Sequence, residues 1–197
     1  MNAKRNESDL IPGRGHPGPD RPALPRAVPA SELSAGRLLA AMLPRLAAGK
    51  RLYCVDGGNL FNPYQLATAA RARGLDPAGL LERILVSRAY TCHQLVAAVE
   101  ELLADAARRD PDAAGAILGV DLLFMNEDIP IEERAHLYGR ILDEAVRLAR
   151  SGMPLLITFV GAGDSPWVKR LGFEGRRVRG IARNYSQNRQ IRIAEGS

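Results

Sequence analysis

The stretch that decides the fold spans residues 53–94 and reads YCVDGGNLFNPYQLATAARARGLDPAGLLERILVSRAYTCHQ. It opens with a short apolar run that ends in Gly57 and Gly58, which indicates a buried strand followed by a sharp turn. Pro63 begins a helical segment that Gly74 closes, and a second short helix follows. Another apolar run, at residues 84–87, predicts a second strand. The stretch therefore predicts a strand–helix–strand unit.

The rest of the chain continues the alternation of helices and strands. Helical patterns cover residues 31–48 with a kink at Pro44, residues 91–108 after a Thr91–Gln94 capping box, and residues 131–150. Apolar runs at residues 116–123 and 153–160 predict core strands of a parallel sheet. A short helix should begin at Ser165-Pro166. Residues 176–182 and 189–193 are expected to form two antiparallel strands at the C-terminal end.

This order predicts an α/β protein with a three-layer sandwich around a mainly parallel central sheet. Residues 1–30 contain six prolines and three glycines and few apolar residues. Such a segment buries too little surface to offset the entropy of ordering, so we expect a disordered tail there. Residues 31–197 are expected to form one core domain.

The composition narrows the class of protein. At 46% hydrophobic residues the chain can bury a core, and its two cysteines do not make a disulfide framework. The sequence shows no apolar run long enough to span a membrane and no secretory signal pattern. These features favour a cytoplasmic protein without a membrane partner.

Positive charge is concentrated toward the C-terminal end. The formal net charge is +5, and residues 169–192 hold eight Lys or Arg but one acid. A block of this kind favours a polyanionic partner such as nucleic acid. The alternative is a charged strand pair that protects a sheet edge. The candidate nucleic-acid-binding residues are Arg176, Arg177, Arg179, Arg183, Tyr185 and Arg189.

Several motifs carry a family resemblance. Phe61-Asn62-Pro63 follows the first strand, Ser87-Arg88-Ala89-Tyr90 ends the second, and residues 117–121 read ILGVD. With these motifs, residues 48–160 resemble the RecA-type strand-exchange ATPases, in particular the archaeal and eukaryotic branch. The resemblance implies a RecA-like fold in which Asp121 is the magnesium-side acid of the Walker B strand.

The same resemblance implies that the ATPase machinery is degenerate. No G-x-x-x-x-G-K-[ST] motif precedes the first strand, and Gly49-Lys50-Arg51 is a poor substitute. Gly58 occupies the position of the acid that activates the attacking water in that family, although Asp56 lies two residues earlier. Residues 158–160 read TFV where the family carries an Asn-Gln sensor. Since phosphoryl transfer depends on positioning and charge stabilisation, we expect no ATP hydrolysis.

Asp56 and Asp121 therefore have two interpretations. They are remnants of a nucleotide and metal site, or Asp121 is a strand-end carboxylate that accepts hydrogen bonds from nearby N–H groups. No cofactor is firmly predicted, and ATP with magnesium is the alternative.

Three functions are consistent with these patterns. The first is a non-hydrolysing RecA-like accessory protein in DNA repair or recombination, which binds DNA, a partner recombinase, or a second copy of itself. The second follows from residues 55–60, VDGGNL, which look like the opening of PIN/NYN-type nucleases. Asp56, Asp121, Asp128 and Asp164 would then form a carboxylate cluster for magnesium. The third is an interaction module that pairs with a complete ATPase.

Overall fold

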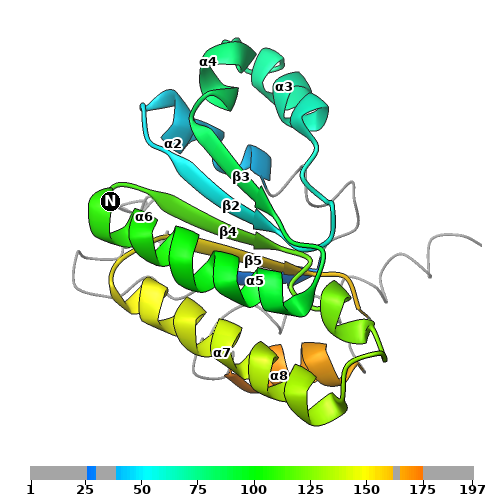
Figure 1. Cartoon of the computed structure of the whole chain (residues 1–197). Helices are drawn as coiled ribbons and strands as arrows, with labels where there is room; N and C mark the ends of the chain where they lie inside the picture. Colours follow the sequence, from blue (N-terminus) through cyan, green and yellow to red (C-terminus); the bar gives the residue numbers. More distant parts are fainter. Residues whose placement is uncertain (1–25, 30–38, 162–164, 175–197) are drawn as a thin grey trace, which may run out of the picture.

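The computed structural model describes residues 26–29, 39–161 and 165–174. Figure 1 shows a central sheet with helices packed on both of its faces. Within these ranges no helix combines the length and the apolar character that a membrane span requires. The expected antiparallel strands at residues 176–193 lie outside the described ranges.

Five strands form one sheet, and every neighbouring pair in it runs parallel. Their spatial order is β1-β5-β4-β2-β3, so β2 lies between β4 and β3. The fold class predicted from the sequence, an α/β protein with a parallel sheet, is therefore confirmed. The strands are β1 (Arg26–Pro29), β2 (Leu52–Asp56), β3 (Ile84–Arg88), β4 (Ala114–Leu118) and β5 (Leu155–Phe159).

The helices divide between the two faces of the sheet. On one face lie α2 (Leu43–Ala47), α3 (Pro63–Arg71) and α4 (Pro77–Leu81). The other face is covered by α5 (Cys92–Ala98), α6 (Ala104–Arg109), α7 (Ile131–Arg150) and α8 (Pro166–Glu174). A π-helical segment, Val99–Leu103, joins α5 to α6, and a 3₁₀ turn, Leu122–Met125, follows β4.

The core consists of two clusters, one on each face. Successive residues of a strand point to opposite faces, so neighbours along β2 belong to different clusters. Leu52 and Cys54 pack with α2, α3 and α4, whereas Val55 packs with α5 and α7. The continuous apolar runs of the inner strands follow from burial on both faces.

Local signals account for most of the helix ends. The side chain of Asn62 accepts hydrogen bonds from the first turn of α3, and that of Asp76 does the same for α4. The hydroxyl oxygen of Thr91 accepts a hydrogen bond from the Gln94 N–H at 3.2 Å, as the capping-box pattern predicts. The Gln94 side chain accepts from the Tyr90 N–H instead of the Thr91 N–H, so the box is shifted by one residue.

The structure corrects three element boundaries. Arg26–Pro29, expected to belong to a disordered tail, forms β1 and pairs with β5. Near Pro44, expected to kink one long helix, Leu43–Ala47 forms the separate helix α2, with the proline in its first turn. The strand expected to extend to residue 123 ends at Leu118, because Gly119 adopts a φ of +62° and turns the chain.

An aromatic cluster fixes α8 against α7. Phe124, Tyr138 and Trp167 pack with ring centroids 4.9 to 5.6 Å apart. The buried hydroxyl of Tyr138 donates a hydrogen bond to the Trp167 carbonyl oxygen at 3.1 Å. This cluster lies beneath the loops that follow β4 and β5, and so it supports the carboxyl end of the sheet.

Candidate functional site

The connections of the sheet place a switch point between β2 and β4. From β2 the chain crosses to β3 on one side, and from β4 it crosses to β5 on the other. In open α/β sheets, ligands bind in the crevice at the carboxyl ends of the strands where the connections diverge in this way. Asp56 ends β2, and Asp121 follows β4 by three residues, so both predicted acids lie at the carboxyl ends of these two strands.

Asp56 is almost fully buried, with 1% of its surface exposed. Its Oδ1 accepts hydrogen bonds from the N–H groups of Leu60 at 2.9 Å and Gly58 at 3.3 Å. Its Oδ2 accepts from the Phe61 N–H at 3.0 Å and lies 3.8 Å from Nε of Arg88. The carboxylate therefore organises the loop that follows β2, and this loop includes Asn59 in a left-handed conformation.

Asp121 has the same kind of environment and is completely buried. Its Oδ1 accepts from the Val160 N–H at 2.9 Å, and its Oδ2 from the Gly161 N–H at 2.6 Å. These bonds join the loop after β4 to the loop after β5. The structure therefore supports the interpretation of Asp121 as a carboxylate bonded to backbone N–H groups.

Leucine side chains fill the space between the two loops. A Cβ atom on Gly58 would lie 2.5 Å from Cδ1 of Leu122 and 3.1 Å from Cγ of Leu60. A Cβ on Gly119 would lie 3.1 Å from both leucines and 3.2 Å from Cα of Gly58. The glycines permit this close packing, and residue 58 has no room for a side chain unless Leu122 moves.

Thr158 takes part in the same network. It is fully buried on β5, and its hydroxyl oxygen accepts a hydrogen bond from the Gly119 N–H at 2.9 Å. The sequence shows that the Asn-Gln sensor is missing at this strand end, but it does not predict the hydrogen bond between Thr158 and Gly119. The hydroxyl holds the turn after β4, and it therefore has a structural partner.

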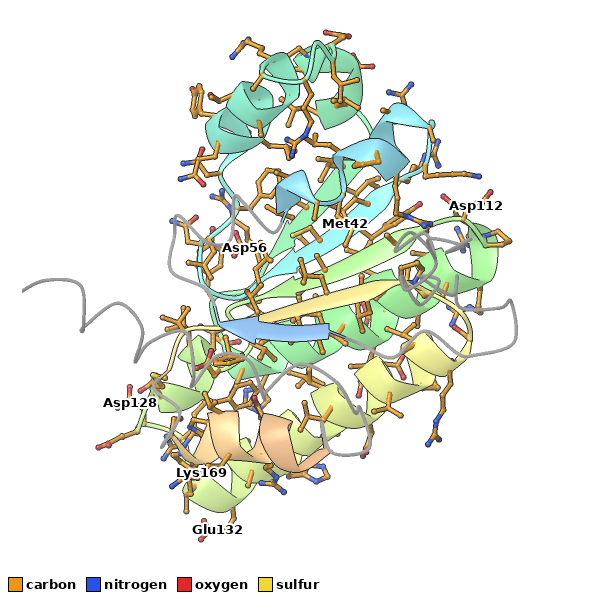
Figure 2. All side chains as sticks on the ribbon, turned by 180° about the vertical axis from the view of Figure 1, so that it is seen from behind. Met42, Asp56, Asp112, Asp128, Glu132 and Lys169 are labelled. Atoms are coloured by element: carbon orange, nitrogen blue, oxygen red, sulfur yellow. The ribbon has the colours of Figure 1, made fainter. Side chains whose placement is uncertain are left out.

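Lys50 lies at the opposite end of the sheet from Asp121. It precedes β2, and its Nζ pairs with the Asp112 carboxylate, which precedes β4. Figure 2 shows Asp112 and Asp56 at opposite ends of the strands. Lys50 is therefore not positioned to bind a phosphate group near Asp56 or Asp121.

The other acids of the predicted cluster do not complete a metal site. Asp128 is exposed in the segment before α7, and its own N–H bonds to the Asn126 side chain. Asp164 lies outside the described residues. Among the residues that the structure describes, no group of three or more His, Cys, Asp or Glu side chains could hold a metal ion.

His93 and Cys92 lie at the start of α5. Nε2 of His93 lies 3.0 Å from Oε1 of Glu133, and its Nδ1 lies 3.7 Å from the Cys92 sulfur. Burial raises the pKa of the Cys92 thiol, and only 1% of this residue is exposed. A protonated, covered thiol is a poor nucleophile, so Cys92 and His93 do not form a reactive centre. The contact of His93 with Glu133 joins α5 to α7.

The basic candidates cannot be placed in the same way. All six lie outside the described residues: Arg176, Arg177, Arg179, Arg183, Tyr185 and Arg189.

Three residues near Asp56 and Asp121 were not predicted as parts of a site: Leu60, Leu122 and Thr158. Ordinary core residues carry no local signal of a site. The pair of glycines at residues 57 and 58 was the signal nearest to them.

No protein-family model matches this chain, and a search of curated proteins found no significant match. The class of protein therefore follows only from the fold and from the residues at the carboxyl end of the sheet. It is an α/β protein with a parallel sheet, in which Leu60 and Leu122 pack against Gly58 and Gly119 at the carboxyl ends of β2 and β4.

Proposed function

We propose that this chain is a RecA-like accessory protein that does not hydrolyse ATP. It acts in DNA repair or recombination by binding DNA, a partner recombinase, or both. The proposal combines the motif resemblance of residues 48–160 with the packing of Leu122 against Gly58 at the carboxyl end of the sheet. Because a shared fold does not imply a shared activity, the proposal that ATP is not hydrolysed rests on the residues at the carboxyl end of the sheet.

Gly58 carries the proposal. In the resemblance, this residue stands where a water-activating acid would be, and Leu122 occupies the space that such a side chain needs. Removing the acid while filling its space favours a stable, inactive site. A side chain at residue 58 would require Leu122 to move, since a Cβ there would lie 2.5 Å from its Cδ1.

The remaining parts of the edge support the same conclusion. The carboxylates of Asp56 and Asp121 already accept hydrogen bonds from five backbone N–H groups in total. These bonds give both carboxylates a structural role that needs no metal ion. Residues 30–42, which connect β1 to α2 along the chain, read ASELSAGRLLAAM and contain no phosphate-binding motif.

The test is to titrate the full-length protein with a labelled ATP analogue and with labelled single-stranded DNA, side by side, and to assay phosphate release with and without DNA. We expect DNA binding without ATP turnover. Robust turnover that the purified protein itself causes would reject the proposal. Failure to bind DNA, with co-purification of a complete ATPase, would favour the interaction-module function.

One observation keeps a metal-dependent nuclease as the second candidate. Asp56 and Asp121 lie at the carboxyl ends of two adjacent strands, where such enzymes hold magnesium. The nuclease hypothesis requires Mg²⁺-dependent cleavage of single-stranded RNA or DNA that Asp56→Asn abolishes. Asp128→Asn, at an exposed acid, is the matched control. Equal cleavage by wild type and Asp56→Asn would exclude this carboxylate from the reaction.

A further inference from the structure

Three large apolar side chains are exposed after the carboxyl ends of β4 and β5. Met125 ends the 3₁₀ turn after β4, Ile131 begins α7, and Val160 directly follows β5. Their surfaces are 42%, 49% and 41% exposed, respectively. Exposed apolar side chains that gather at one place indicate an interaction surface. We call these three residues the apolar patch.

Contacts between the loops hold the apolar patch together. A Cβ on Gly161 would lie 2.8 Å from Cε of Met125, so the residues after β5 lie against the turn after β4. The Arg134 side chain, in the first turn of α7, donates a hydrogen bond at 2.9 Å to the carbonyl oxygen of Phe124, which belongs to that turn after β4. The three apolar residues therefore lie on neighbouring segments at one end of the molecule.

The segment that leads from β4 into α7 is acidic. Residues 122–133 contain no Lys or Arg, and Glu127, Asp128 and Glu132 are exposed. None of these three acids forms a salt bridge with another residue of the described ranges. A partner that fits this surface carries apolar side chains together with positive charge.

The C-terminal segment of this chain, residues 175–197, has that chemistry. It contains six arginines and one acid, Glu195. Apolar residues alternate with the arginines, since residues 177–179 read RVR and residues 191–193 read IRI. The segment lies outside the described ranges, and its sequence complements the three acids in charge and the apolar patch in polarity.

The C-terminal segment begins close enough to reach this surface in the same molecule. A Cβ on Gly161 would lie 3.4 Å from Cβ of Ser165, which directly precedes α8, so α8 starts beside the apolar patch. Lys169 of α8 lies at the same end of the molecule as Asp128 in Figure 2. At about 1.5 Å per residue, α8 carries the chain about 13 Å away. An extended chain covers about 3.3 Å per residue and closes this distance within a few residues.

The tether also favours this occupant over a separate molecule. A segment joined to its site by a short chain has an effective concentration of about a millimolar, so even weak contacts are populated. We propose that the apolar patch, with Glu127, Asp128 and Glu132, binds the basic C-terminal segment of the same chain. Because the arginines of that segment are those proposed to bind nucleic acid, docking would compete with nucleic acid, and this regulatory consequence rests on the proposed function.

Paramagnetic relaxation tests the docking without nucleic acid. Ser186→Cys in the full chain carries a spin label, and the native Cys54 and Cys92 are buried and should stay unlabelled. The amide signals of residues 125–132 and 160–161 should be broadened much more strongly than those of α3, which lies on the other face of the sheet. Broadening at the apolar patch that does not exceed broadening at α3 would overturn the proposal.

Two pairs of substitutions test the charges. Glu127→Gln with Glu132→Gln should reduce the broadening, because the arginines lose two of their three acidic partners. The control pair, Glu101→Gln with Asp143→Asn, removes two other exposed acids and should leave the broadening unchanged. Equal broadening in the two pairs would remove the acids from the docking surface and overturn the proposal.

A mixture of chains identifies which molecule supplies the segment. Spin-labelled chains are mixed with isotope-labelled chains that lack the spin label, and the latter should show no broadening. Broadening in the mixture would assign the contact to a second copy and reject docking within one chain.

Nucleic acid then tests the competition. A single-stranded oligonucleotide should remove the broadening at the apolar patch, and the pair Glu127→Gln with Glu132→Gln should bind it more tightly than the control pair does. Binding that leaves the broadening unchanged would reject the competition. If no oligonucleotide binds, the proposed function fails, whereas the docking is judged by the measurement without nucleic acid.

Discussion

Cδ1 of Leu122 lies 2.5 Å from the place where a Cβ on Gly58 would be. The two residues come from the loops after adjacent strands β2 and β4, at the edge where an open α/β sheet normally binds its ligand. This close approach leaves residue 58 without room for a side chain while Leu122 keeps its position. Substitutions at Gly58 and Leu122 can therefore measure how far the two residues compete for the same space.

Replacing Gly58 by Ala should destabilise the protein by about 1–3 kcal/mol, because the added methyl group overpacks against Leu122. The measurement is the free energy of unfolding from urea titration. Leu122→Ala should relieve the clash, so the double variant should be more stable than the sum of the single effects predicts. Gly139→Ala, in α7 with no atom near its added Cβ, is the control and should stabilise the helix slightly. Additive effects at Gly58 and Leu122 would mean that the two residues do not compete for space.

Asp121→Asn should cost about 1–3 kcal/mol of stability, since the Val160 or the Gly161 N–H group loses the acceptor oxygen of a fully buried side chain. The affected groups are the N–H groups of Val160 and Gly161, so faster hydrogen exchange should appear first at these amides. Asp128→Asn, at an exposed position, should change neither quantity. Unchanged exchange at Val160 and Gly161 in Asp121→Asn would contradict the structural role of this carboxylate.

Stability should fall as the pH rises above about 8.5, the ordinary pKa of a thiol. Burial raises the pKa of the Cys54 thiol, and the charge of Asp56 raises it further, so the folded state keeps a proton that the unfolded state releases. The unfolded state is then favoured by about 1.4 kcal/mol per pH unit for each such thiol.

Cys54→Ala should reduce that slope, as measured by urea unfolding between pH 8 and pH 10, and the Cys92 thiol, whose pKa burial also raises, contributes the remainder. The buried phenol of Tyr138 also has a raised pKa and adds a second contribution only at higher pH, near its ordinary value of about 10. A slope that is identical in wild type and Cys54→Ala would exclude this thiol as its source.

Replacing Arg176, Arg177 and Arg179 together by Ala should weaken oligonucleotide binding and reduce its dependence on salt. Each phosphate contact that is lost lowers the slope of log K against log salt by about one. The measurement is fluorescence anisotropy at several salt concentrations. Replacing Arg71, Arg73 and Arg109, which are exposed in or next to α3 and α6, gives a control with the same change in net charge. An unchanged salt slope in the first variant would remove these arginines from the proposed function.

The elements that the sequence predicted well are those with strong local signals. Ile131 and Arg150 bound α7 as its apolar stripe predicts, and the short helix expected after Gly74 is α4, which Asp76 caps. The strand expected at residues 116–123 was wrong at its end, because Gly119 and Asp121 belong to a turn that continues the apolar run. Hydrophobicity alone does not distinguish a buried turn from a strand.

The candidate site was predicted in part. Asp56 and Asp121 were located, and the structure places both at the same edge of the sheet. Their bonds to Leu60, Phe61, Val160 and Gly161 depend on loop conformations that no local pattern specifies. Arg26–Pro29 was expected to be disordered because a proline-rich segment has little apolar surface, yet its backbone pairs with β5.

By itself, the sequence determined the α/β class, most helix boundaries and the absence of the phosphate-binding motif, because these depend on residue types and on spacings of a few positions. Three features came only from the tertiary structure: Leu122 packs against Gly58, β1 joins the sheet, and β3 is the last of the described strands in the spatial order. Each of these is a contact or an exposure set by residues far apart in the chain, or by the spatial order of strands. Such relationships arise only when the parallel strands are assembled, since local periodicity does not encode which strands become neighbours.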